Sequence, residues 1–191
     1  MKKIISILIL SFLILSCKND DDGTNSELPE ITTEGKNTFG CKIDGVTFLP
    51  VEDLYGWHDP TENLIAHYGY DEYYYGGYAF NIRASNELLD KSISLKMSDS
   101  EIPLNEGSTY PLELEIDDNF NAVYHHWDSD SNLYYDYITN EEYSGEMTIL
   151  KLDEDNKIIA GTFWFDCVDI STGKTSRITE GRFDLKYLEY W

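Results

Sequence analysis

The chain has 191 residues, a formal net charge of −22 and an aromatic content of 14 %. Nucleic acids and anionic lipid head groups repel a protein this acidic, because their partners display Lys and Arg. The composition therefore excludes nucleic-acid binding and leaves neutral or cationic ligands open.

Residues 1–16 have the pattern of a bacterial export signal. Two lysines precede an apolar run, Ile4 to Leu15, which is too short to cross a bilayer of roughly 30 Å as a helix. Ser16 and Cys17 end this run, and a small residue before a cysteine at this place resembles the lipobox of bacterial lipoproteins. The resemblance implies cleavage before Cys17 and a lipid on its thiol. The alternative is a secretory peptide cleaved elsewhere, or an uncleaved anchor.

Residues 17–37 follow as a polar segment. Asp20 to Asp22 resemble the acidic export signal that sends Bacteroidota lipoproteins to the cell surface, and the alternative is a solvated linker. The segment has almost no large apolar side chains, which predicts a flexible tether. We therefore expect a lipid-anchored outer-membrane protein, displayed at the cell surface, with a single domain over residues 38–191.

The rest of the chain alternates apolar and polar residues with a period of two, which predicts strands. Residues 86–91 form the only helix candidate, barely one turn long, and 110–116 is expected to pair with 122–127. The fold class is all-β, an antiparallel β-sandwich or open barrel whose last three strands form a meander. The predicted strands are 38–43, 46–49, 64–70, 78–85, 92–98, 110–116, 122–127, 133–139, 145–152, 157–167 and 177–187.

Three segments at the two ends of this domain carry a resemblance: Phe39 to Gly45, Ile159 to Phe163, and Ile178 to Asp184. They resemble an uncharacterised family of Bacteroidota lipoproteins with an all-β domain. No catalytic residue follows from this resemblance, because the function of that family is itself unknown. Gly161 and Gly181 are expected at β-bulges, or where a facing aromatic ring covers bare backbone.

Two cysteines remain if Cys17 carries lipid. Cys41 shares a strand face with Phe39, and Cys167 shares one with Phe165, so both thiols are expected to point toward the core. An even pair in an oxidising compartment makes Cys41 and Cys167 a disulfide candidate. The alternative is two separate buried thiols that pack as small apolar groups.

No motif for a nucleophile, a phosphate loop, a dinucleotide or zinc is present in the sequence. His125 and His126 leave a strand on opposite faces and cannot share a metal. Asp128 to Asn132 has oxygen ligands at alternate positions but lacks the glycine and glutamate of a calcium loop. We predict an acidic turn there, and neither a cofactor nor a metal for the chain.

Aromatic residues gather around a glycine turn, and they are the most suggestive feature of the sequence. Exposed rings beside carboxylates can stack on sugar faces, but the more common role of alternate tyrosines is to pack the core or to form cross-strand pairs. The candidates for ligand stacking are Trp57, Tyr70, Tyr73, Tyr74, Tyr75 and Tyr78.

Three functions remain open. The first is a binding or accessory module of the envelope for a glycan, a peptide or an envelope protein, which requires several aromatic side chains exposed in one patch. The second is a structural envelope protein without a ligand site, whose aromatics are scattered. The third is a hydrolase using carboxylates, which requires two acids, or a histidine and an acid, in one cleft. The sequence favours the first of these and leaves catalysis uncertain.

Overall fold

The computed structural model describes residues 27–51, 63–115 and 119–190, and the secondary structure of these residues consists of eleven strands. No helix in these ranges has the length and apolarity needed to cross a membrane. The all-β prediction is confirmed. The strands are β1 (Thr38–Ile43), β2 (Val46–Phe48), β3 (Leu64–Asp71), β4 (Gly77–Asn86), β5 (Lys91–Ser100), β6 (Thr109–Leu112), β7 (Asn121–Asp128), β8 (Leu133–Ile138), β9 (Gly145–Asp153), β10 (Ile158–Asp169) and β11 (Thr175–Lys186).

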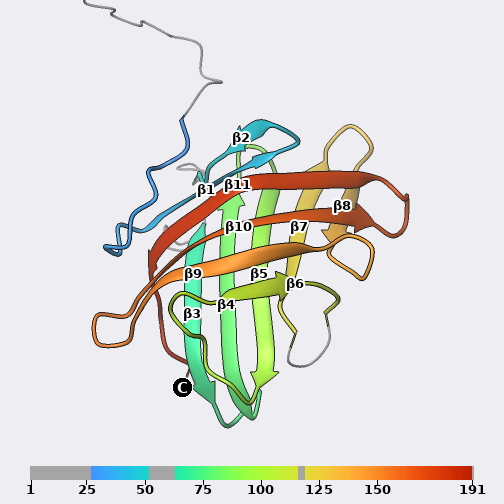
Figure 1. The fold of residues 1–191 in the computed structure, drawn as a ribbon. Coiled ribbons are helices and arrows are strands. Elements are labelled where there is room, and N and C mark those ends of the chain that lie inside the picture. The colour runs from blue at the N-terminus through green and yellow to red at the C-terminus, as the bar shows by residue number, and fades with distance from the viewer. Residues whose placement is uncertain (1–26, 52–62, 116–118, 191) are drawn as a thin grey trace, which may run out of the picture.

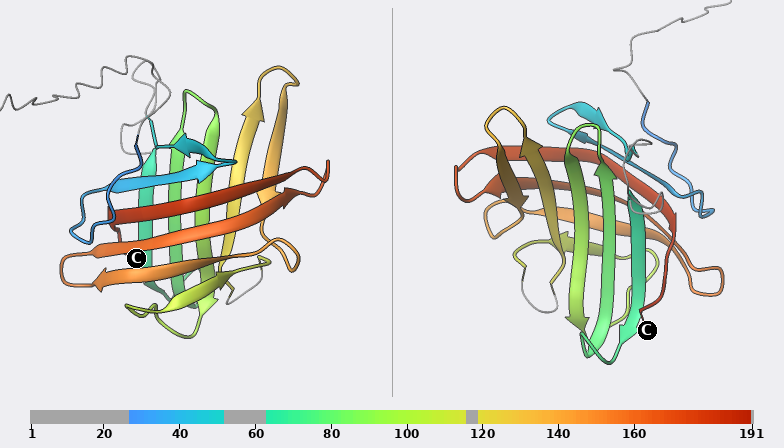
Figure 2. Two further views of the ribbon diagram at one scale, coloured as in Figure 1. Left: turned by 45° about the horizontal axis from the view of Figure 1, so that its top comes forward. Right: turned by 180° about the vertical axis from the view of Figure 1, so that it is seen from behind.

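All the strands belong to one antiparallel sheet that bends over on itself. One arm contains β3, β4, β5, β7 and β8, and the other contains β2, β1, β11, β10, β9 and β6. The arms meet where the end of β10 pairs with β8 through Val168 and Asp169. Figure 1 shows the strands of the two arms crossing at a steep angle, and Figure 2 shows them as two facing layers. The result is a half-barrel with a sandwich-like core, and β9, β10 and β11 form the predicted meander.

Local chemistry explains most of the turns. Asp44 and Gly45 join β1 to β2 with φ values of 51° and 84°, as a two-residue hairpin turn requires. The helix candidate at 86–91 is only a turn, where the side chain of Asn86 accepts a hydrogen bond from the Leu89 amide at 3.1 Å. Asparagine favours such a side-chain turn over a helix.

The predicted pairing of residues 110–116 with 122–127 is wrong. Strand β6 pairs with β9, whereas β7 lies between β5 and β8. Between β6 and β7, Leu112 and Phe120 form an isolated bridge, and the Glu113 amide donates to the Phe120 carbonyl at 2.8 Å. Period-two alternation identifies a strand but carries no information about its partner, which tertiary packing decides.

Two glycines of the meander are positioned as predicted. Strand β11 has one extra residue relative to both neighbours beside Gly181, where Glu180 has a φ of 53°. A Cβ at Gly181 would lie 2.6 Å from the ring of Phe163, and one at Gly161 would lie 2.6 Å from the ring of Phe183. The two pairs are cross-strand partners, so each ring covers the bare backbone of a facing glycine.

Residues 27–37 depart from the predicted tether, because they pack against the sheet. Asp184 of β11 is only 1 % exposed and accepts hydrogen bonds from the Thr32 hydroxyl at 2.5 Å and from the Glu34 and Gly35 amides at 3.0 and 2.6 Å. Burial raises the pKa of Asp184, but these hydrogen bonds outweigh it and hold the pKa below its ordinary value. Composition alone cannot reveal a single carboxylate that collects three donors from a distant segment.

The disulfide prediction is contradicted, because Cys41 and Cys167 are both free, buried thiols. Cys41 is in β1 and Cys167 in β10, and β11 lies between these strands. Two strand spacings separate the backbones by roughly 9–10 Å, beyond the reach of a disulfide. The alternative holds: the thiols pack in the core, where burial raises the pKa of Cys41 far above its usual range and that of Cys167 to about 12.

Candidate functional site

The hairpin between β3 and β4 carries the tyrosine cluster. Asp71 ends β3 and accepts hydrogen bonds from the Tyr73 and Tyr74 amides at 2.9 and 2.8 Å. Gly76 has a φ of 70°, which lets the chain turn back into β4. The carboxylate and the glycine therefore fix the backbone that presents the tyrosines.

Four of the predicted tyrosines are exposed on this hairpin. Tyr73 and Tyr74 are 83 % and 79 % exposed, and Tyr70 and Tyr75 are also exposed. The rings of Tyr73 and Tyr74 lie edge to face with their centroids 5.0 Å apart. Several exposed rings on one hairpin form the kind of patch that marks an interaction site, whereas scattered single rings do not. We call Tyr70, Tyr73, Tyr74 and Tyr75 the tyrosine tip.

Tyr78 has a different environment. It is half-buried, lies opposite Tyr70 across the hairpin and stacks on the buried ring of Tyr68 with a centroid distance of 6.3 Å. Packing between aromatic rings, the alternative to ligand stacking, therefore applies to Tyr68 and Tyr78. The stack connects the tyrosine tip rigidly to the core.

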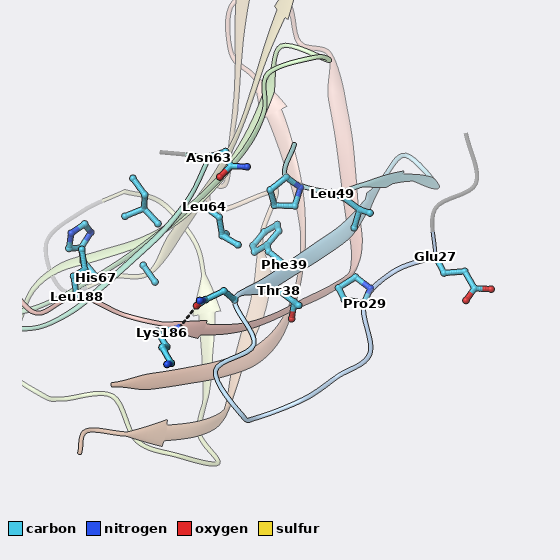
Figure 3. Close-up of a pocket in the computed structure, with 14 residues that line it drawn as sticks. Glu27, Pro29, Thr38, Phe39, Leu49, Asn63, Leu64, His67, Lys186 and Leu188 are labelled. Carbon is cyan, nitrogen blue, oxygen red and sulfur yellow. Dashed lines mark hydrogen bonds between the residues drawn. The ribbon is translucent and has the colours of Figure 1, made fainter. Parts of the chain in front are cut away.

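A groove of about 720 Å³ lies beside β3, between this strand and β1, and Figure 3 shows its lining. Its walls are mostly apolar, with Phe39 and Leu49 on one side and Leu64 and Leu188 on the other. The volume falls within the roughly 300–1,000 Å³ typical of small-ligand sites. The C-terminal segment closes one side, because Leu188 exchanges backbone hydrogen bonds with Ala66 and Tyr68 at 2.9 and 3.0 Å.

A row of aromatic rings connects the groove to the tyrosine tip. His67 lines the groove and packs on the ring of Tyr190 with a centroid distance of 5.4 Å. Tyr190 in turn meets Tyr75 edge to face at 5.6 Å. The groove and the tip therefore form one continuous surface along the edge of the half-barrel.

The polar groups of this surface are few and mixed in charge. Lys186 and Glu27 line the groove with the amides of Asn37 and Asn63, and the Lys186 amide donates to the side chain of Asn37 at 2.9 Å. Burial lowers the pKa of His67, so its imidazole is neutral at pH 7. An uncharged ligand with several hydroxyl groups matches such a lining better than an anion does.

The histidines of β7 do not join this surface. Cys17 and Trp57 lie outside the described residues. His125 and His126 do leave β7 on opposite faces, since His125 bonds to Asp136 at 2.6 Å while His126 packs on Tyr124. Within residues 27–51, 63–115 and 119–190, no three His, Cys, Asp or Glu side chains form a group that could hold a metal ion.

The predicted acidic turn at Asp128 to Asn132 joins β7 to β8. Asp128 accepts hydrogen bonds from the Asp130 amide at 3.0 Å and the Ser131 hydroxyl at 2.8 Å. These bonds lower the pKa of Asp128, the Ser131 hydroxyl contributing most. The carboxylate therefore stabilises the turn.

Neither the groove nor Tyr190 was predicted from the sequence. The groove forms between β1 and β3, which are not sequence neighbours, so no local pattern contains it. The run Leu188 to Tyr190 gave one signal, because apolar and aromatic residues continue beyond the last predicted strand.

No protein-family model matches the chain, and comparisons with curated proteins and with solved structures find no match either.

Proposed function

We propose that this chain is a lipid-anchored binding module of the bacterial envelope whose ligand is an uncharged glycan. The observation that carries the proposal is the tyrosine tip, continuous with an apolar groove through His67 and Tyr190. Ring faces of exposed tyrosines pack on the apolar faces of sugars, and their hydroxyls bond to sugar hydroxyls. The net charge of −22 disfavours an anionic glycan.

The proposed anchor rests on the sequence pattern alone. An apolar leader that ends at Ser16-Cys17 and is followed by three acids supports a lipoprotein carried to the outer membrane and displayed at the cell surface. The resemblance to Bacteroidota lipoproteins at both ends of the domain supports the same location. In this account the lipid holds the binding surface near the membrane, where envelope glycans are concentrated.

Glycan-array binding by residues 18–191 tests the proposed ligand class. We expect binding to neutral glycans, and a loss of about tenfold or more in the Tyr73→Ala/Tyr74→Ala variant, because stacking on a ring contributes of the order of 1 kcal/mol or more per tyrosine. Tyr134→Ala is the matched control, since Tyr134 is 71 % exposed but lies on β8, away from the tip. No binding, or equal loss in both variants, contradicts the proposal.

The mass of the protein isolated from its native membrane tests the anchor. We expect a chain that begins at Cys17 and carries a diacylglycerol and an added acyl chain. A mass that corresponds to an intact leader, or to an unmodified Cys17, rules out the anchor but leaves the proposed ligand site untouched.

A further inference from the structure

A second cavity, of about 290 Å³, opens at the other end of the half-barrel from the tyrosine tip. Asp44 of the β1–β2 turn and Leu89 of the β4–β5 turn line it. The tyrosine tip is the β3–β4 turn, at the opposite end of β4. The apolar lining of the cavity comes mainly from Ile43, Val46 and Phe48. It shares no lining residue with the groove beside β3.

Two buried phenols line this cavity without hydrogen-bond partners in the described chain. Tyr124 and Tyr137 are only 4 % and 8 % exposed, lie opposite each other on β7 and β8 and stack at a centroid distance of 5.2 Å. No hydrogen bond joins either hydroxyl to another described residue. Neither hydroxyl oxygen is among the fully buried polar atoms of the described residues, so both are open to the cavity, and a ligand that enters it can accept their hydrogen bonds.

Both phenols remain hydrogen-bond donors at any physiological pH. Burial is the main cause that raises the pKa of Tyr124 far above its usual range, and burial also raises the pKa of Tyr137. The nearest carboxylate of the lining is already occupied, because Asp44 accepts from the Ser176 hydroxyl and the Arg177 amide, each at 2.8 Å.

The cavity also contains a lysine without an acidic partner. Lys91 lines it and lies opposite His126 across β5 and β7. None of the ion pairs of the described residues involves Lys91. Lys174 forms none of them either, and its ammonium lies 4.9 Å from the ring centre of Tyr135. The Tyr135 ring in turn packs against His126. In a chain with 36 acidic and 14 basic residues, such a lysine is available to an anion.

We infer that this cavity binds a small aromatic monocarboxylate. The Lys91 ammonium and the hydroxyls of Tyr124 and Tyr137 supply donors for the two carboxylate oxygens, and Phe48 and Val46 face the apolar part. The single negative charge of a carboxylate is balanced by the single lysine. A doubly charged phosphate has a second negative charge, which the net negative charge of the protein repels. The cavity volume suits a ligand of about ten non-hydrogen atoms, at the small end of known sites.

Calorimetric titration of residues 18–191 with benzoate, benzyl alcohol and phenyl phosphate tests this inference. We expect benzoate to bind at least about tenfold more tightly than either of the others, since hydrogen bonds to a charged group are the strong ones. Equal affinity for benzyl alcohol, or tighter binding of phenyl phosphate, overturns the carboxylate assignment.

Variants then locate the site. Tyr124→Phe/Tyr137→Phe keeps both rings and removes only the hydroxyls, and Lys91→Met keeps the length of the side chain and removes its charge. Each is expected to weaken benzoate binding by about tenfold or more, while Tyr73→Ala/Tyr74→Ala leaves it unchanged. Benzoate binding that survives both cavity variants overturns the inference, and neither result bears on the glycan site at the tip.

Discussion

Replacing Gly161 by alanine is expected to lower the free energy of unfolding by about 3 kcal/mol. The new Cβ would overlap the carbonyl oxygen of Thr148 and lie 2.6 Å from the ring of Phe183. The carbonyl belongs to the paired strand β9 and cannot move without breaking the ladder. Chemical denaturation measures the effect.

Gly173→Ala is the matched control for this substitution. Gly173 has a φ of 70° and no neighbour within 4 Å of an added Cβ, so only backbone strain of about 1 kcal/mol is expected. Equal losses in the two variants would contradict the packing explanation.

The Gly181–Phe163 pair permits a sharper test of the same idea. At Gly181 the three atoms nearest to an added Cβ all belong to the ring of Phe163, each at 2.6 Å. The double variant Gly181→Ala/Phe163→Leu is therefore expected to lose less stability than the two single variants together. Additive losses would show that the ring and the glycine do not depend on each other.

Asp184→Asn is expected to cost about 3 kcal/mol and to release residues 27–37 from the sheet. The new side-chain amide has an NH2 group where the carboxylate accepted hydrogen bonds from Thr32, Glu34 and Gly35. Donors then face donors, and buried groups lose their hydrogen bonds. Hydrogen exchange at the Glu34 and Gly35 amides should accelerate with the loss of stability. Glu180→Gln is the control, because Glu180 is on the same strand but exposed and forms ion pairs with Lys42 and Arg182; we expect it to change little. Unchanged exchange in Asp184→Asn would contradict the role of this carboxylate.

Asp184 also sets a pH dependence. Its pKa in the folded chain lies below the ordinary value, so its contribution to stability is complete above the unfolded pKa of about 4 and disappears as the pH falls through the folded pKa. We expect the wild type to lose stability more steeply than Asp184→Asn below about pH 4. Parallel profiles would contradict the assignment.

The sequence predicted this fold well where the signal is local. Alternation located the strands, and Asp44-Gly45 identified the first hairpin, because turn chemistry and side-chain period are properties of neighbouring residues. The pairing of β6 with β9 was not predicted, and neither was the packing of residues 27–37 against Asp184. Both depend on contacts between segments that are distant in the sequence.

The candidate site follows the same division. The sequence identified these tyrosines as candidates because they are contiguous around one turn, but it favoured packing in the core over ligand stacking. The structure exposes Tyr70, Tyr73, Tyr74 and Tyr75 and half-buries Tyr78. The groove and Tyr190 required the fold, because they unite β1, β3 and the C-terminal segment.

The central claim is that the groove and the tyrosine tip form one glycan site, and nuclear magnetic resonance mapping tests it most directly. Residues 18–191 are titrated with the neutral glycan that binds most tightly on the array. We expect the signals of His67, Leu188 and Tyr190 to shift together with those of Tyr73 and Tyr74, at one common dissociation constant. Shifts confined to another face, such as that of Trp164 on β10, would contradict it.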